Sequence, residues 1–386
     1  MNDTPAPEDI LHMQRCFALA EQALTIARPN PAVGCVIVKD GRIVGEGHTQ
    51  QPGQPHAEIM ALRQAGANAR GAIAYVSLEP CAHHGRTGPC SEALVNAGVV
   101  RVVYAMEDPN PLVSGKGLAA LRDAGVDVCG PLLETEATAL NPGFFKRMRT
   151  GFPYVRCKVG MSLDGRTAMA SGESQWITGE EARADVQRFR ARSCAVLTGV
   201  GTVLADDPSL NVRLPDFIGV QPLRVVVDSQ ARLPAAARLL QLPGRVLQAG
   251  CVAPAAQAER AAAQTQAEHD AAQAGSATTQ WDYRQLPGED GKVQLSELLR
   301  LLAQDYHCNE ILVEAGATLT GALLQQGLVD ELLTYVAPLL LGPEGRPLAH
   351  LAGLERLDQA LRFDFLDVVK LGKDCRIRSL PANRAG

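Results

Sequence analysis

This sequence of 386 residues has few aromatic side chains, no long apolar runs and no large excess of positive or negative charge. Phe, Trp and Tyr make up 4% of the chain, so aliphatic residues must fill the cores. No window reaches the roughly 20 apolar residues of a membrane-spanning helix, and the N-terminal residues lack the basic and then apolar pattern of a secretory signal. These absences predict that the protein has no membrane partner and lies in the cytoplasm.

The charge balance excludes a second class of partner. The chain has 37 Lys and Arg against 42 Asp and Glu, and neither half is basic. A protein that follows a phosphate backbone needs clustered cations with interleaved aromatic residues, and none is found. We therefore expect no nucleic-acid partner, although one or two placed arginines suffice for a small phosphorylated ligand.

Length and composition indicate two ordinary globular domains. A chain of 386 residues that is 46% hydrophobic is longer than one compact domain usually is. Ten cysteines are scattered along it, which argues against a disulfide scaffold and predicts mostly reduced, buried thiols. The turn residues Thr150-Gly151-Phe152-Pro153 suggest a boundary, which predicts domains at residues 1–149 and 150–386.

The first domain is predicted to be an α/β sandwich. A helical pattern over residues 7–27 precedes two strands at 32–38 and 43–47, which are joined by a turn at Asp40-Gly41. Helices and strands then alternate, which is typical of a central sheet with helices packed on it. The expected elements are helix 57–65, strand 72–78, a helix after residue 90, strand 99–105, helix 118–124, strand 126–128 and one helix over 134–149.

The second domain is predicted to be another alternating α/β domain. Residues 253–279 are rich in Ala, Gln and Glu with little apolar periodicity, so we expect a solvated insertion there. The expected elements are strands 154–160, 195–198, 223–227, 245–247, 311–314 and 332–338, and helices 179–192, 295–305 and 319–327.

One constellation in the first domain predicts metal chemistry. His56-Ala57-Glu58 has the H-x-E form, and Cys81 and Cys90 follow it in the order found in zinc deaminases. Three protein ligands leave a fourth position on Zn²⁺ for a water, whose pKa the metal lowers, and a nearby carboxylate moves its proton. We therefore predict His56, Cys81 and Cys90 as zinc ligands and Glu58 as the catalytic proton shuttle. A purely structural zinc site, with His83 or His84 as fourth ligand, would leave Glu58 without a task.

The spacing of the two cysteines indicates which kind of zinc deaminase this domain resembles. Eight residues separate Cys81 from Cys90, where common nucleoside deaminases have two, and they include His83 and Arg86. At this point the chain resembles the bifunctional riboflavin-biosynthesis deaminases and reductases. In the first domain the resemblance rests on Asn30-Pro31-Ala32-Val33-Gly34, His56-Ala57-Glu58, the Pro80 to Cys90 loop and Asp108-Pro109-Asn110-Pro111.

The second domain carries further segments of the same resemblance. These are Lys158 to Arg166, Ser174 to Thr178, Gly199 to Pro208 and Glu314 to Ala322. As a bare pattern the glycine turn near Gly316 is weak evidence, since many turns between a strand and a helix need glycine for backbone geometry alone. A helix that starts there would nevertheless offer free amides to a cofactor's phosphates.

The resemblance implies a fold, two reactions and their site residues. The expected folds are a cytidine-deaminase-like α/β/α domain and a dihydrofolate-reductase-like α/β domain. The implied function is zinc-dependent deamination of diaminohydroxyphosphoribosylaminopyrimidine, then NADPH-dependent reduction of the ribosyl chain of 5-amino-6-(5-phosphoribosylamino)uracil to ribityl. A homo-oligomer associated through the reductase half is also implied. Asn30, His83 and Arg86 would bind the first substrate, together with His48 and Asn110, although Asn30 and Asn110 equally suit plain turns.

For the reductase, the resemblance implies two sets of residues. The predicted NADPH-binding residues are Gly160, Trp176, Thr202, Asp206, Ser229, Gly316, Ala317, Thr318, Leu319, Thr320, Gly321 and Ala322. The predicted substrate-binding residues are Ser174, Arg190, Leu210, Arg213 and Glu314.

Two other hypotheses remain open at this stage. The C-terminal domain could be a nucleotide-binding regulatory module attached to a monofunctional deaminase, and Arg190 could lie on a solvated helix face. A nucleic-acid-editing protein is the third hypothesis, against which the balanced charge speaks.

Overall fold

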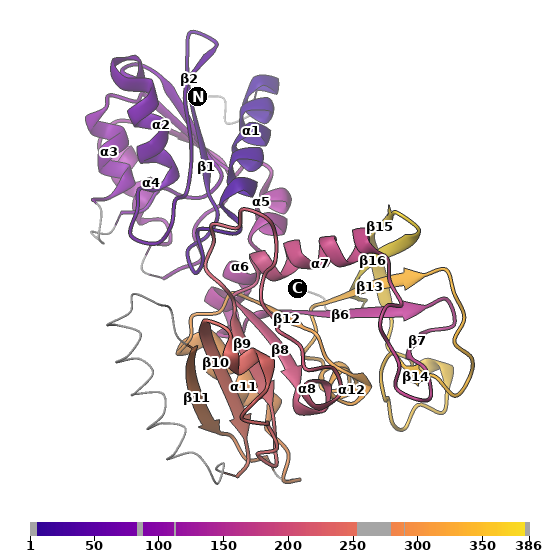
Figure 1. Ribbon diagram of the computed structural model, residues 1–386. Helices are drawn as coiled ribbons and strands as arrows, with labels where there is room; N and C mark the ends of the chain where they lie inside the picture. Colours follow the sequence, from indigo (N-terminus) through magenta and orange to yellow (C-terminus); the bar gives the residue numbers. More distant parts are fainter. Residues whose placement is uncertain (1–5, 83–87, 112, 253–278, 289, 383–386) are drawn as a thin grey trace. The chain divides into compact units, whose positions relative to one another are not determined.

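The computed structural model describes residues 6–82, 88–111, 113–252, 279–288 and 290–382 (Figure 1). The chain divides into two compact units, Met1–Phe152 with Ile218–Val220, and Pro153–Phe217 with Gln221–Gly386. We call them the N-terminal unit and the C-terminal unit. None of the helices in the described residues is long and apolar enough to cross a membrane.

The N-terminal unit is built on a five-stranded sheet in the order β2-β1-β3-β4-β5, with helices packed on it (Figure 1). β1 pairs antiparallel with β2 and β3, while β3, β4 and β5 run parallel. The strands are β1 (Gly34–Lys39), β2 (Arg42–His48), β3 (Ile73–Val76), β4 (Arg101–Tyr104) and β5 (Asp127–Cys129). The helices are α1 (Pro7–Ala23), α2 (Ala57–Ala65), the 3-10 turn η1 (Gly66–Ala69), α3 (Cys90–Asn96), α4 (Lys116–Asp123), α5 (Glu134–Leu140) and α6 (Pro142–Thr150).

Local chemistry explains how this sheet receives its helices. The turn between β1 and β2 uses Asp40 and Gly41, both with positive φ, as the Asp-Gly pair predicts. β2 then presents Gly47 to α2, and a Cβ at this position would lie 2.3 Å from the carbonyl oxygen of Ala57. Helix α2, and with it the predicted site residues His56 and Glu58, therefore lies closer to the sheet than a larger side chain would allow.

The single helix predicted over residues 134–149 is wrong, because the structure has two helices there. Asn141 leaves the helical region, with φ −121° and ψ 45°, and Pro142 begins α6. Proline suits the first position of a helix but cannot continue one. The side chain of Asn141 instead exchanges two hydrogen bonds with the backbone of Ala32, at 2.9 and 2.8 Å.

The C-terminal unit contains a nine-stranded sheet in the order β11-β10-β9-β8-β12-β6-β13-β16-β15. The strands from β11 to β13 in this order are parallel, and β16 and β15 add an antiparallel edge (Figure 1). The strands are β6 (Tyr154–Ser162), β8 (Ala195–Gly199), β9 (Leu223–Val227), β10 (Gly244–Gly250), β11 (Thr279–Gln285), β12 (Glu310–Val313), β13 (Glu331–Ala337), β15 (Phe363–Leu371) and β16 (Asp374–Pro381).

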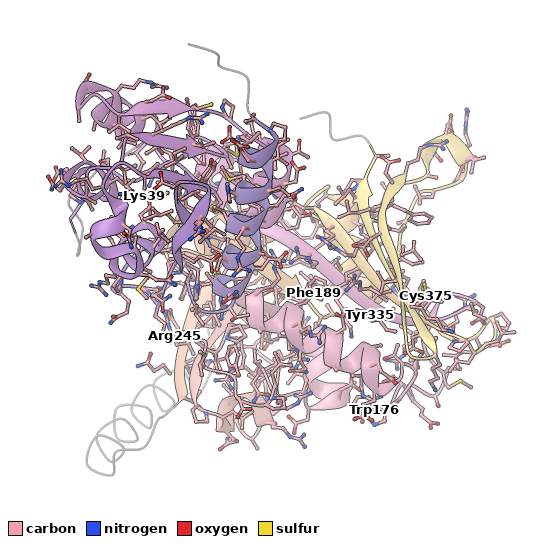
Figure 2. The ribbon with its side chains drawn as sticks, turned by 90° about the horizontal axis from the view of Figure 1, so that it is seen from above. Lys39, Trp176, Phe189, Arg245, Tyr335 and Cys375 are labelled. Carbon is pink, nitrogen blue, oxygen red and sulfur yellow. The ribbon has the colours of Figure 1, made fainter. Side chains whose placement is uncertain are left out.

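Helices and one small ribbon complete this unit. β7 (Arg166–Ala168) pairs with β14 (Arg346–Pro347) in a separate two-stranded sheet. The helices are α7 (Glu180–Arg192), α8 (Val200–Asp206), α9 (Arg238–Gln241), α11 (Leu295–Gln304), α12 (Ala317–Gln325) and the 3-10 turn η2 (Leu357–Gln359). Phe189 on α7 and Tyr335 on β13 belong to one buried apolar cluster between helix and sheet (Figure 2).

A buried ionic network lies within the C-terminal sheet. Arg156, which is fully buried on β6, contacts Glu310 at 2.9 Å and Glu331 at 3.0 Å. Arg192 binds Glu310 at 2.7 Å, and Arg378 binds Glu331 at 2.6 Å. Each buried carboxylate therefore faces two guanidinium groups, which offset the cost of removing it from water.

The sequence predictions omitted several elements of the C-terminal unit. β7, β11, β14, β15 and β16 and the short helices α8 and α9 were not predicted. The predicted insertion at 253–279 lies outside the described residues, except for Thr279, which begins β11. Thr279 is therefore part of a strand and not of an insertion.

Candidate functional site

The three predicted metal ligands meet in the N-terminal unit. Sγ of Cys81 lies 3.6 Å from Nδ1 of His56, and Sγ of Cys90 lies 3.4 Å from the same atom. One donor atom from each residue falls within 4.8 Å of the others, a spacing that suits a single ion. One imidazole and two thiolates are ligands that Zn²⁺ prefers, so the residues present fit the predicted metal.

Helix starts and a strand end bring these ligands together. His56 is the N-cap of α2, and Cys90 is the first residue of α3. Cys81 follows β3, and its carbonyl oxygen accepts hydrogen bonds from the amide and hydroxyl of Ser91, at 3.2 and 3.1 Å. The amide of Cys90 also points at Sγ of Cys81, 3.4 Å away. Amides at a helix start stabilise a negative sulfur.

The electrostatics of the cluster favour a thiolate. Hydrogen bonding from Cys90, together with that from His56, outweighs burial and lowers the pKa of Cys81 to about 4. The pKa of Cys90 is raised, since its thiol gives its proton toward Cys81 and is itself buried. Without a metal the pair therefore holds one thiolate and one thiol, and a bound dication would favour loss of the second proton.

Glu58 lies on the first turn of α2 and is 4% exposed. Burial, together with the nearby charge of Cys81, raises the pKa of its carboxyl group to about 7. A carboxyl group with a pKa near neutrality can both accept and release a proton at physiological pH. This behaviour is what the predicted proton shuttle requires.

A second buried carboxylate, Glu79, organises the loop behind Cys81. Its oxygens accept amide hydrogen bonds from Asp108 at 3.2 Å, Gly115 at 2.9 Å and Gly117 at 2.9 Å. A Cβ on Gly117 would lie 1.8 Å from the carbonyl oxygen of Pro80, so only glycine fits there. No role was predicted for Glu79 from the sequence, although an acidic residue two positions before a ligand, beyond a strand end, is a usable signal.

The residues predicted to bind the pyrimidine substrate do not form a cluster comparable to that of the three metal ligands. His83 and Arg86 lie outside the described residues. Asn30 is exposed, with its amide bonded to the carbonyl of Ala27 in a turn. His48 ends β2, and burial lowers its pKa. Asn110 donates its amide to Asp108, which is the arrangement of an Asx turn.

The C-terminal unit contains a large cleft of about 2050 Å³ along the carboxyl ends of its parallel strands. This edge of a parallel sheet is the usual place for a nucleotide. All five predicted substrate residues and ten of the twelve predicted cofactor residues line it. They are Ser174, Arg190, Leu210, Arg213 and Glu314, and Gly160, Trp176, Thr202, Asp206, Ser229, Gly316, Ala317, Thr318, Leu319 and Ala322.

Two predicted cofactor residues on α12 do not line the cleft. Thr320 is fully buried, and its hydroxyl donates to the carbonyl of Ala315 at 3.4 Å. Gly321 faces the backbone of His350, where a Cβ would lie 2.0 Å from a carbonyl oxygen. Helical geometry explains the difference, because successive residues of α12 point in different directions and only part of the helix can face a ligand.

Two of the residues that line the cleft form a buried charge pair. Nε and Nη2 of Arg190 contact the two carboxylate oxygens of Glu314 at 2.5 and 3.0 Å. Burial alone would raise the pKa of Glu314, but Arg190 and then Lys158 outweigh it and lower the pKa to about 2. Arg190 is 7% exposed, so the solvated helix face considered for it is wrong.

Trp176 forms an exposed part of the cleft wall. Its side chain is 68% exposed (Figure 2). The guanidinium of Arg183 lies 4.7 Å from its ring centre. Arg183 also donates to the carbonyl of Thr178 at 2.6 Å, which fixes the cation over the ring. An exposed indole held in this way offers a flat face to a planar ligand.

The cleft contains further basic residues that were not predicted from the sequence. Lys158, Arg232, Lys292, Arg346 and His350 all line it. Lys158 lies within a segment that carried the resemblance, and its ammonium is 3.9 Å from Glu314. Nothing in the local sequence distinguishes Arg232 or Lys292 from ordinary surface cations.

Comparisons with known proteins match both units. A family model for the cytidine and deoxycytidylate deaminase zinc-binding region matches residues 7–106, and a model for the RibD C-terminal domain matches residues 153–377. The chain is 50% identical to riboflavin biosynthesis protein RibD of Escherichia coli, with 95% of this chain and 98% of that protein covered. It is 45% identical to the Haemophilus influenzae protein of the same name, with 97% and 98% covered.

Solved structures agree with the sequence matches. Acinetobacter baumannii RibD superposes with a TM-score of 0.85 at 48% identity, covering 97% of this chain and 99% of that one. A Thermotoga maritima diaminohydroxyphosphoribosylaminopyrimidine deaminase/5-amino-6-(5-phosphoribosylamino)uracil reductase gives a TM-score of 0.82 at 29% identity, covering 97% and 99%.

These matches confirm the predicted fold class, with a cytidine-deaminase-like unit followed by a RibD reductase unit. They also favour the bifunctional enzyme over a deaminase with a regulatory module. Zinc and NADPH are the cofactors of the two activities. The chain belongs to the RibD family of riboflavin biosynthesis enzymes, which combine a zinc-dependent deaminase with a reductase.

Proposed function

We propose that the N-terminal unit deaminates diaminohydroxyphosphoribosylaminopyrimidine and that the C-terminal unit reduces 5-amino-6-(5-phosphoribosylamino)uracil. The Thermotoga maritima relative has these two activities in its name. The observation that carries the proposal is the coexistence, in one chain, of the His56, Cys81 and Cys90 cluster and the cleft around Arg190 and Glu314.

In the deaminase reaction, water replaces the amino group on the pyrimidine and ammonia leaves. Zinc, when bound by His56, Cys81 and Cys90, supplies an activated water. Glu58 accepts the proton of this water on its carboxylate and delivers it to the departing nitrogen. The pKa of Glu58, near 7, supports both halves of this transfer.

In the reductase reaction, the bond between C1′ and the ring oxygen of the ribose breaks and the sugar opens. NADPH, when bound, supplies the hydride that C1′ receives. The freed oxygen must also receive a proton. We assign the delivery of this proton to the pair of Lys158 and Glu314, which lie 3.9 Å apart. Burial lowers the pKa of Lys158, which eases the release of a proton into the cleft.

The two predicted arginines of this site have different tasks in the proposal. Nε and Nη2 of Arg190 already donate to the carboxylate of Glu314, and Nη1 donates to the carbonyl of Asn211 at 3.0 Å. We therefore assign Arg190 to positioning Glu314. Arg213 is exposed in the cleft, and among the described residues its guanidinium bonds to Ser209 and Asn211, neither of which is charged, so it is the better cation for the substrate phosphate.

One assay of the purified protein tests the proposal. We expect about one zinc per chain by metal analysis, ammonia release from the diaminopyrimidine phosphate, and NADPH oxidation only after that release. NADPH oxidation on the undeaminated substrate would contradict the proposed order. Ammonia release without any NADPH oxidation would contradict the reductase assignment.

The proposal also includes the cellular location and the oligomeric state of the protein. The substrates named above are small and polar, so we propose a cytoplasmic location, which cell fractionation tests. We also propose a homo-oligomer, which sedimentation of the purified chain tests.

A further inference from the structure

Two exposed cations line one section of the reductase cleft and have no partner among the described residues. Arg232 follows β9, and Lys292 precedes α11. In the sheet, β8 separates β9 from β12, the strand after which Glu314 and the proposed reaction centre lie. The two cations therefore belong to a different section of the cleft from the proposed hydride transfer.

The loop that carries Arg232 is held in place by a buried carboxylate. Asp228 is fully buried, and its Oδ2 accepts hydrogen bonds from the amide of Leu233 at 2.8 Å and from Nε2 of Gln248 at 2.9 Å. Ala231, with a positive φ of 56°, bonds back to the carbonyl of Asp228. The four residues from Ser229 to Arg232 therefore form a fixed turn.

The loop that carries Lys292 is hydrogen-bonded to the turn that carries Arg232 through Ser229. The amide of Val293 donates to Oγ of Ser229 at 3.1 Å, which brings Lys292 beside the first turn. The carbonyl oxygen of Lys292 accepts the amide of Gly288 at 2.7 Å, and an isolated bridge joins Pro287 to Val293. Two independent loops thus bring one hydroxyl and two cations to one wall.

We propose that Arg232 and Lys292, together with the hydroxyl of Ser229, bind the 2′-phosphate of NADPH and give the reductase its preference for NADPH over NADH. This inference rests on the proposed NADPH site. A 2′-phosphate carries up to two negative charges and several acceptor oxygens, which match two cations and a hydroxyl donor. NADH has only a hydroxyl at that position.

One nearby residue argues for the opposite preference. Asp290 lines the same section of the cleft, and in NADH-specific sites a carboxylate commonly accepts the ribose 2′-hydroxyl. Two cations against one carboxylate leave a net positive charge, which favours the phosphate. The phosphate of the substrate is the other anion to consider, but the proposed substrate site has its own cation in Arg213.

Binding measurements on Arg232→Ala and Lys292→Ala test the proposal. The probes are NADPH, NADH, adenosine 2′,5′-bisphosphate and AMP, titrated into the full-length protein by calorimetry. Each substitution is expected to raise the Kd of NADPH and of the bisphosphate about 10- to 100-fold, because a charge-assisted contact is lost. The Kd values of NADH and AMP are expected to stay within about twofold.

A matched control and three outcomes make the test decisive. Lys370→Ala removes an exposed cation on β15, outside the cleft, and should change none of these constants. Unchanged NADPH binding in both cleft variants, or an equal loss for NADPH and NADH, would overturn the inference. So would a higher KM for the pyrimidine phosphate with intact NADPH affinity. Failure of the unmodified protein to bind NADPH would instead contradict the proposed function.

Discussion

The two sites of this enzyme are built in different ways. The deaminase site concentrates its chemistry in four side chains, His56, Glu58, Cys81 and Cys90, which lie at two helix starts and one strand end. The reductase cleft spreads over the carboxyl ends of several strands and draws on residues from Lys158 to His350. In the first site two helix starts and a strand end bring the ligands to one point, and in the second the backbone must shape a surface for a long dinucleotide.

This difference predicts how single substitutions affect the two activities. A compact site depends on a few side chains and on the loops that hold them, so single substitutions should remove one activity and spare the other. A broad cleft shares its contacts, so a substitution should weaken binding more often than it abolishes turnover. Four experiments probe this contrast, from the largest expected effect to the smallest.

Glu58→Gln should cause the largest loss. An amide cannot carry the proton, so we expect ammonia release to fall by about 10²- to 10⁴-fold. Zinc content, measured by metal analysis, should stay near that of the unmodified protein, and NADPH oxidation with the deaminated substrate should be unchanged. Undiminished ammonia release would remove Glu58 from the mechanism.

Glu314→Gln should weaken the reductase alone. The substitution leaves Arg190 buried without its carboxylate, and we expect kcat/KM for the uracil substrate to fall by about 100-fold. The deaminase rate serves as the internal reference. Glu297→Gln, which removes an exposed carboxylate on α11, is the matched control and should leave both rates unchanged. Equal losses in the two variants would contradict the assigned role.

Acid should destabilise the C-terminal unit through Glu310. Burial alone would raise the pKa of this group, but Arg192 and Arg156 lower it to about 2. The folded pKa is thus below the unfolded value near 4.5, so the stabilisation is complete above pH 4.5 and disappears as the pH falls toward 2. The expected size is about 3 kcal/mol. Urea unfolding at several pH values measures it, and Glu310→Gln should flatten the slope.

Gly117→Ala should produce the smallest effect of the four. The new Cβ would lie 1.8 Å from the carbonyl of Pro80, so the loop beside Cys81 must move, at a cost of about 1–3 kcal/mol. We expect weaker zinc retention against a chelator and a normal reductase rate. Gly88→Ala, whose added Cβ meets nothing within 4 Å, is the control. Identical zinc retention in the two variants would show that the close approach at Gly117 is not needed.

The same contrast explains what could be predicted from the sequence. The zinc cluster was predictable because its residue types are uncommon together and their spacing is short. Regular elements such as α2 and β1 followed from periodicity and from the Asp-Gly turn. The break at Asn141-Pro142 was missed because a proline at the start of a second helix resembles one inside a long helix.

The reductase cleft was predictable only through the resemblance. Its residues reach one wall by the pairing of strands that are distant in sequence, such as β6 with β12, and no local pattern records this pairing. Thr320 and Gly321, within the continuous stretch that was predicted, do not line the cleft, because a helix points its successive residues in different directions. The β15–β16 hairpin was missed because its outer strand has exposed apolar residues, including Phe365 and Val368, in place of a clean alternation.

The anchoring of Cys81 has a consequence for how enzymes of this kind diversify. Glu79 fixes the chain just before this cysteine, and Ser91 fixes it from the far side of the intervening segment. Because Ser91 bonds directly to Cys81, the two ends of the intervening segment are held to each other. We infer that exchange of this segment between members of the family would leave the separation of the two sulfurs, and with it the metal cluster, unchanged.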